Sequence, residues 1–158
     1  MSADQPATLL AVDLGFRSGL ALFGRDGRLI WYRSTNFGSR ARLKKAAYGV
    51  LRQIDALSRV VAEGDATLGD IWQKNAEKCG AYFKRIHAEI WREELLFERH
   101  RRSGQEAKAR ADFLARQVIE WSGLPRPTSL RHDAAEAILV GLWGVLNAGW
   151  LAENPLES

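Results

Sequence analysis

The chain has 158 residues, with 23 Lys and Arg against 19 Asp and Glu, and a formal charge of +4. This length suits a single domain over residues 1–158, whose ends, 1–7 and 153–158, are expected to be flexible. The single cysteine, Cys79, excludes an internal disulfide, the apolar stretch 137–146 is too short to span a bilayer, and 1–8 has no apolar signal segment. These properties predict a soluble, cytoplasmic protein with no membrane partner.

Three short strands are expected first. Apolar residues occupy 9–12 and 19–23, with a turn-prone segment at 15–18 between them, and 29–33 forms the third strand. Asp26 and Gly27 between the second and third strands are a strong hairpin signal, because glycine tolerates the positive φ of tight turns. The three strands therefore predict an antiparallel meander.

Helices and strands alternate in the rest of the chain. Ser39 caps the first expected helix, in which apolar residues recur at spacings of three and four from Leu43 to Ile54. The later elements are expected as a strand at 59–62, a helix at 68–84, a strand at 87–91, a helix at 106–121 stopped by Pro125 and Pro127, and a helix at 132–151. This order predicts an α/β fold with a mixed five-stranded sheet, antiparallel in its first three strands and parallel in the later ones, flanked by helices.

Four carboxylates stand at strand ends or at a helix start. Asp13 ends the first strand, Glu63 follows the fourth, and Asp133 and Glu136 share the first turn of the last helix. Each has an ordinary interpretation, as a turn former, a surface residue or acids that favour a helix N-terminus. Together they suit Mg²⁺, or Mn²⁺ in its place, and two such ions about 4 Å apart can promote phosphodiester hydrolysis. His132, beside Asp133, suits an orienting or acid-base role, although a helix-capping or solvent-facing histidine is the simpler interpretation.

Segments 10–23, 60–64 and 132–137 resemble the three acidic motifs of RuvC-type Holliday junction resolvases, which belong to the ribonuclease H-like superfamily. The resemblance implies a ribonuclease H-like fold and a crossover junction endodeoxyribonuclease of DNA recombination and repair. Asp13, Glu63, Asp133 and Glu136 would hold two Mg²⁺ ions, and branched DNA would be cut by symmetric hydrolysis. The family usually has aspartate where this chain has Glu136. It also commonly has an aromatic residue soon after the second acid, where this chain has 65–68; Trp72 or Phe16 would have to substitute, and both are expected to pack instead.

Basic residues gather in two regions and are either solvated faces or contacts for a DNA backbone. The first cluster surrounds Ser103 and Gly104, the second lies at the first helix, and Arg17 follows Asp13. The expected DNA-binding residues are Arg17, Arg40, Lys44, Arg99, Arg101, Arg102, Lys108 and Arg110. By the resemblance, Lys108 is also a catalytic candidate that contacts the phosphate near the cut, and the 68–84 helix is the expected interface of a homodimer.

Other functions stay open from the sequence. An actin-like ATPase or sugar kinase would share the segment around Asp13 and Gly15, but 158 residues are too few for the two domains it needs. A catalytically silent nucleic-acid-binding module would keep four like charges close together with no metal to neutralise them, which is destabilising. Within the nuclease interpretation, the substrate is a four-way junction, a flap or other branched DNA, or an RNA-DNA hybrid.

Overall fold

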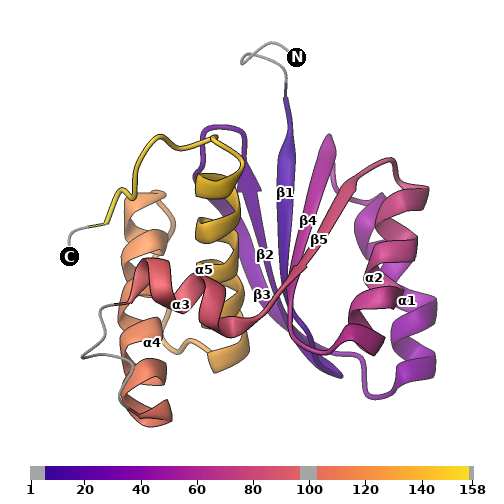
Figure 1. Cartoon of the computed structure of the whole chain (residues 1–158), viewed down its shortest axis with the longest axis horizontal. Helices are drawn as coiled ribbons and strands as arrows, with labels where there is room; N and C mark the ends of the chain where they lie inside the picture. The colour runs from indigo at the N-terminus through magenta and orange to yellow at the C-terminus, as the bar shows by residue number, and fades with distance from the viewer. Residues whose placement is uncertain (1–5, 97–102, 157–158) are drawn as a thin grey trace.

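Strand β1 (Thr8–Asp13) lies at the centre of a five-stranded sheet, and its apolar side chains are buried on both faces. The computed structural model describes residues 6–96 and 103–156 (Figure 1). The other strands are β2 (Arg17–Gly24), β3 (Leu29–Asn36), β4 (Leu57–Glu63) and β5 (Tyr82–Ile86). They follow the order β3-β2-β1-β4-β5, in which β1, β2 and β3 pair antiparallel while β4 and β5 join in parallel. The predicted mixed sheet is thus confirmed.

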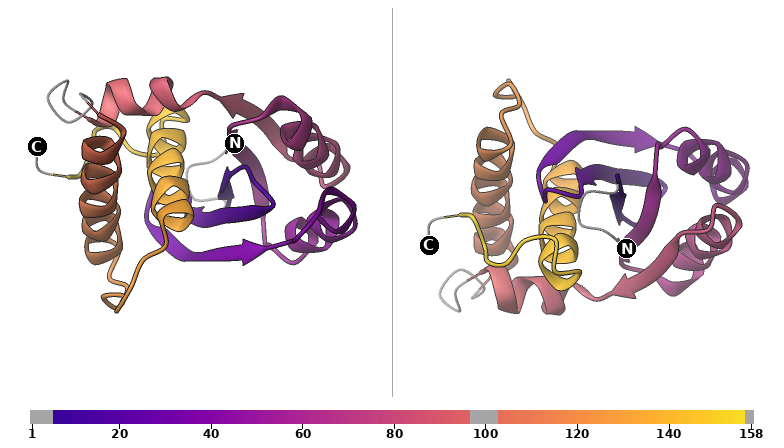
Figure 2. Two further views of the ribbon diagram at one scale, coloured as in Figure 1. Left: turned by 90° about the horizontal axis from the view of Figure 1, so that it is seen from below. Right: turned by 90° about the horizontal axis from the view of Figure 1, so that it is seen from above.

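Helices cover both faces of the sheet. Helices α1 (Arg40–Arg52) and α2 (Ala66–Lys78) cover the face that receives Leu10 and Val12. Helix α5 (His132–Asn147) covers the face that receives Leu9 and Ala11, with α3 (Ala88–Leu95) beside it. Helix α4 (Gly104–Trp121) packs outside α5, so this side of the sheet has two layers of helix (Figure 2).

Helix α5 approaches the sheet through glycines. A Cβ atom added at Gly141 would lie 2.0 Å from Cε1 of Phe23 on β2, and one at Gly144 would lie 3.2 Å from Cδ1 of Leu9 on β1. Both positions therefore hold the helix axis close to the strands. This approach decides how near the first turn of α5 comes to the ends of the strands.

The expected helix at 68–84 is too long, and the strand expected at 87–91 is misplaced. Helix α2 ends at Lys78 because Gly80 adopts a positive φ of 74°, a left-handed conformation that commonly terminates helices. The fifth strand is therefore Tyr82–Ile86, and the segment expected to be a strand forms α3 instead. The apolar spacing continued through Tyr82 and Phe83, which concealed the change of structure.

Other helix ends and packing residues also depart from expectation. Helix α4 ends at Trp121 as expected, but Gly123 with its positive φ follows the helix ahead of both prolines. Helix α5 ends at Asn147 rather than at residue 151. Trp72 is fully buried as expected, whereas Phe16 is 49% exposed in the turn between β1 and β2, so the prediction that it packs was wrong.

The predicted caps and turns were largely right. Ser39 caps α1 by accepting a hydrogen bond from the Arg42 amide, and Gly27 has the positive φ of the hairpin. Residues 1–7 and 153–158 were expected to be flexible. Among those that the structure describes, Ala7 is buried and Leu156 is half-buried against the core. Within residues 6–96 and 103–156, no helix combines the length and apolar character needed to cross a bilayer.

Candidate functional site

Four residues on neighbouring strands form one row across the carboxyl end of β1. In the sheet register, Asp13 of β1 pairs with Glu63 of β4 on one side and with Gly19 of β2 on the other. Gly19 in turn pairs with Ser34 of β3. The row therefore reads Glu63, Asp13, Gly19, Ser34, and it brings two of the predicted carboxylates onto adjacent strands.

Both carboxylates point to the face covered by α5. Side chains alternate along a strand, so Asp13 shares a face with Leu9 and Ala11, and Glu63 shares one with Val61. Leu9, Ala11 and Val61 all belong to the apolar core beneath α5. The sheet thus directs Asp13 and Glu63 toward the helix that carries the other two predicted acids.

Gly19 allows the start of α5 to reach this row. A Cβ atom at Gly19 would lie 1.8 Å from the backbone oxygen of Asp133 and 2.9 Å from the amide nitrogen of Ala134. No side chain fits in that space. The absence of one lets the first turn of α5 rest directly on β2, beside the paired position of Asp13.

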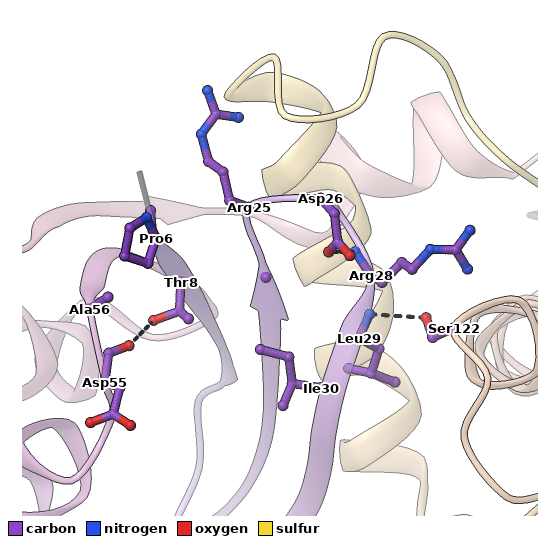
Figure 3. Close-up of a pocket in the computed structure, with 12 residues that line it drawn as sticks. Pro6, Thr8, Arg25, Asp26, Arg28, Leu29, Ile30, Asp55, Ala56 and Ser122 are labelled. Atoms are coloured by element: carbon purple, nitrogen blue, oxygen red, sulfur yellow. Dashed lines mark hydrogen bonds between the residues drawn. The ribbon is translucent and has the colours of Figure 1, made fainter. Parts of the chain in front are cut away.

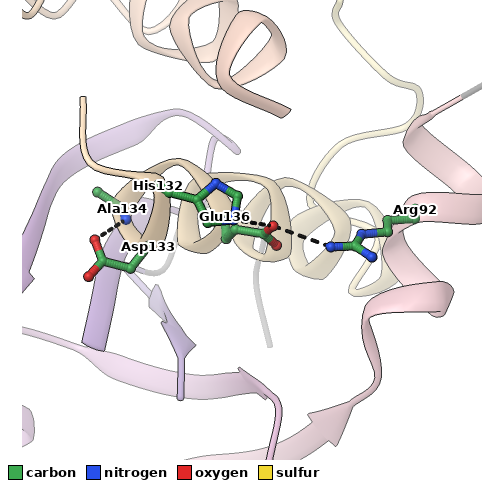
Figure 4. A network of polar contacts seen from close by, with 5 residues as sticks. All are labelled: Arg92, His132, Asp133, Ala134 and Glu136. Carbon is green, nitrogen blue, oxygen red and sulfur yellow. Dashed lines mark hydrogen bonds and ion pairs between the residues drawn. The ribbon is translucent and has the colours of Figure 1, made fainter. Parts of the chain in front are cut away.

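The two acids of α5 turn to different partners (Figure 4). Asp133 Oδ2 accepts a hydrogen bond from Ser34 Oγ, at 2.9 Å, on β3. Glu136 Oε1 lies 3.0 Å from His132 Nε2 and 3.4 Å from Arg92 Nη2 of α3, and its side chain is only 6% exposed. Glu136 is therefore a buried carboxylate with two basic neighbours.

Burial and mutual repulsion disfavour the charge of the carboxylates. The pKa of Asp13 is raised from 3.8 to about 9, first by burial and then by a hydrogen bond with Glu63 and the charges of Glu63, Glu136 and Asp133. The pKa of Glu136 is also raised, chiefly by burial, against the opposing effects of His132 and Arg92. These four acids thus act on one another, as a shared site requires.

The donor set fits a hard divalent cation, although the side chains do not yet converge on a point. Asp13, Glu63, Asp133 and Glu136 offer carboxylate oxygens, which Mg²⁺ and Mn²⁺ prefer. A cation would favour the charged form of Asp13, which burial now disfavours. In the part of the chain that the structure describes, no three His, Cys, Asp or Glu side chains are grouped to hold an ion. To bind a cation through Oε1, Glu136 would have to leave Arg92 and His132, whereas the bond from Ser34 occupies only Oδ2 of Asp133.

The predicted basic residues lie in different parts of the fold. Arg17 is exposed at the start of β2, and Arg40 and Lys44 are exposed on the first turns of α1, which begins at the carboxylate edge after β3. Lys108 is exposed on the outer helix α4, where the half-buried Arg110 lies over the Phe113 ring. Arg99, Arg101 and Arg102 lie outside the described residues.

Three residues that contribute to the site were missed from the sequence. Gly19 and Ser34 occupy the row beside Asp13, and Arg92 pairs with Glu136. Gly19 was visible as a glycine inside an apolar strand, a pattern typical of close backbone approach. Nothing near Arg92 in sequence signals its place, since it depends on the packing of α3 against α5.

A hollow lies at the end of the sheet opposite to the carboxylates. It has a volume of about 500 Å³, and Thr8, Arg25, Asp26, Asp55 and Ser122 are among the residues that line it (Figure 3). Thr8 begins β1 whereas Asp13 ends it, so this hollow is separate from the carboxylates. Its polar groups are used in local structure: Asp26 Oδ1 accepts from the Arg28 amide, and Thr8 Oγ1 donates to the carbonyl oxygen of Asp55.

Comparison with known protein-family models gave no match, and a search of curated proteins gave none either. The resemblance to the resolvases therefore depends on the three acidic motifs, and the assignment of function depends on the chemistry of the site.

Proposed function

We propose that this chain is a metal-dependent, structure-selective DNA endonuclease that hydrolyses phosphodiester bonds in Holliday junctions or other branched DNA. The observation that carries the proposal is the meeting of Asp13, Glu63, Asp133 and Glu136, from three separate segments, at one edge of the sheet. A cluster of buried acids costs stability unless a cation or a proton neutralises it. A ribonuclease H-like arrangement of the mixed sheet is part of the same proposal.

In this proposal the four carboxylates hold two Mg²⁺ ions, with Mn²⁺ as a substitute, and these ions supply an activated water and stabilise the leaving oxygen. The residues of the chain position them. The paired strands place Asp13 beside Glu63, Gly19 lets α5 bring Asp133 and Glu136 to the same edge, and Ser34 orients Asp133. The His132 side chain is 43% exposed, and its Nε2 lies 3.0 Å from Glu136 Oε1, so a proton could pass through it between Glu136 and solvent.

The proposed substrate is a nucleic acid because exposed basic residues occupy the same end of the sheet as the acids, and the resemblance to the resolvases favours DNA. Arg17 begins β2 two residues before Gly19, and Arg40 begins α1 directly after the Ser39 cap. Hydrogen bonds from Thr67 and Leu68 lower the pKa of Asp65, the cap of α2, and the charge of Arg40 adds a smaller effect, so the starts of α1 and α2 lie near each other. Phosphate contacts from Arg17, Arg40 and Lys44 would position a backbone without reading its sequence.

A homodimer would give two sites for symmetric cleavage, and its proposed interface is α2. The apolar residues of this helix, among them Ile71, Trp72 and Ala76, are already buried in its own core. Asp70, Gln73, Lys74 and Glu77 are exposed, so the interface would have to be polar. Light scattering at micromolar concentration tests this part, and a strict monomer with and without junction DNA would contradict it.

The nuclease proposal is tested by cleavage with Mg²⁺ on a matched panel of four-way junction, flap, duplex and RNA-DNA hybrid, with Asp13→Asn as the control. We expect symmetric nicks on the junction and a loss of at least about 100-fold in rate for Asp13→Asn, because one metal ligand is lost. The variant should still bind the junction.

Other results of these assays would support a different function. Equal cleavage by Asp13→Asn would exclude the carboxylates as the active site. Cleavage of flaps as fast as junctions would support a branched-DNA nuclease without four-way specificity. Binding without cleavage by the wild-type protein, with Mg²⁺ or Mn²⁺, would favour the silent nucleic-acid-binding module.

A further inference from the structure

We propose that Arg92 is a substrate-binding residue of the carboxylate site, where it binds a phosphate of the DNA backbone and competes with the metal for Glu136. The inference rests on the proposed nuclease function and adds to it a specific phosphate contact. None of the predicted basic clusters includes this residue.

Helix α3 brings Arg92 to the site. Trp91, the preceding residue, is fully buried in the core beneath α5 and anchors the helix there. The Arg92 guanidinium lies 5.3 Å from the centre of the Trp91 ring, within the range of a cation-π contact. Arg92 thus stands beside Glu136 on a helix whose position is set by core packing rather than on a loose loop.

The contact with Glu136 is asymmetric in burial. The carboxylate side chain is 6% exposed, whereas that of Arg92 is 33% exposed. The Arg92 side chain is therefore open to solvent beside a carboxylate that is closed to it. Among the described residues, Arg92 and His132 are the basic side chains within ion-pair distance of the four acids.

The protein leaves part of the guanidinium unused. An arginine offers five donors in a planar fork, and strong charge-assisted bonds are about 2.7–2.9 Å long. The bond from Nη2 to Glu136 is longer, at 3.4 Å, and Nε is buried without a hydrogen-bond partner among the described residues. Because Nε is closed to solvent, a phosphate would be bound by the two Nη groups, and such paired donation to two phosphate oxygens is the recognition to which arginine is best suited.

A purely structural ion pair would behave differently from a phosphate-binding residue. If Arg92 only holds Glu136 in place, its removal would disturb metal binding and would leave the dependence of DNA affinity on salt unchanged. If it binds phosphate and competes for Glu136, removal should strengthen metal binding and weaken DNA binding. Opposite changes in the two affinities therefore separate the two roles.

The test uses Arg92→Gln and Arg92→Lys, with Arg126→Gln as the matched control. Arg126 is an exposed arginine that pairs with Glu120 at 3.2 Å, so its change to glutamine alters the net charge equally. Mn²⁺ affinity is measured by calorimetry without DNA. Junction affinity is measured by fluorescence anisotropy with Ca²⁺ in place of Mg²⁺, over a range of salt concentrations, after urea unfolding has shown that each variant folds.

For Arg92→Gln we expect Mn²⁺ to bind roughly three- to tenfold tighter, because a nearby positive charge is removed. Junction affinity should fall roughly tenfold, with the slope of log affinity against log salt reduced by about 0.9, the value for one lost phosphate contact. Arg92→Lys should keep the slope and lose less affinity, since it keeps the charge without the fork. Arg126→Gln should match the wild type in Mn²⁺ affinity and in the salt slope.

Weaker Mn²⁺ binding by Arg92→Gln, or an unchanged salt slope, would overturn the inference while leaving the nuclease proposal standing. Failure of the wild-type protein to bind any branched DNA would instead overturn the nuclease proposal, and the inference with it. Should Arg92→Gln fail to fold, Arg92→Lys decides: affinity equal to the wild type would exclude a bidentate phosphate contact.

Discussion

Replacing Gly19 by alanine should force the start of α5 away from the sheet. The added Cβ atom would lie 1.8 Å from the Asp133 backbone oxygen, whereas ordinary van der Waals contact begins near 3.4 Å. The helix start or β2 must therefore move by about 1.6 Å. Because both partners are backbone atoms within regular elements, no flexible side chain can absorb the change.

The cost follows from this geometry. Overpacking of a well-packed interior typically costs about 1–3 kcal/mol of unfolding free energy. The displacement also moves Asp133 and Glu136 relative to Asp13 and Glu63, and a misplacement near 1 Å can cost roughly 100-fold in a catalytic rate. Gly19→Ala should thus lower both stability and Mg²⁺-dependent cleavage.

Gly49→Ala is the matched control, because its Cβ would meet no atom within 4 Å in the middle of α1. Alanine there should raise stability by about 0.5–1 kcal/mol, through lower chain entropy in the unfolded state. Urea unfolding followed by tryptophan fluorescence should therefore separate the two variants by about 1.5–4 kcal/mol. Equal stability of Gly19→Ala and the wild type would refute the close approach of α5 to β2.

Two further predictions concern charge and packing. Because the pKa of Asp13 is raised to about 9, the folded protein keeps a proton that the unfolded chain releases above pH 3.8. The free energy of unfolding, measured in EDTA to remove metal ions, should therefore fall as the pH rises toward 9. Between pH 5 and 8, wild-type stability should fall by at least about 1 kcal/mol more than that of Asp13→Asn in urea titrations; parallel curves would contradict the assigned shift. Trp72→Ala removes a fully buried ring that packs edge-on against Phe37, and should cost about 3–5 kcal/mol; a calorimetric melting temperature within a degree of the wild type would contradict this packing.

The mixed character of the sheet and the places of the acids could be predicted largely from local patterns. Continuous apolar runs marked β1 and β4, whose last residues are Asp13 and Glu63, and the Asp26-Gly27 turn marked the hairpin. The boundary between α2 and β5 could not be predicted in the same way. Tyr82 and Phe83 continue the helical spacing, and only the left-handed Gly80 ends the helix before them.

The sequence by itself determined which carboxylates end strands and begin the last helix, because strand and helix signals are local and Asp13, Glu63 and Asp133 stand at their boundaries. Only the tertiary structure decided what surrounds them. The contact of Gly19 with Asp133 joins residues 114 positions apart, and the pair of Arg92 and Glu136 joins residues 44 positions apart. Such contacts arise from how helices pack on a sheet and on one another, which no local pattern encodes.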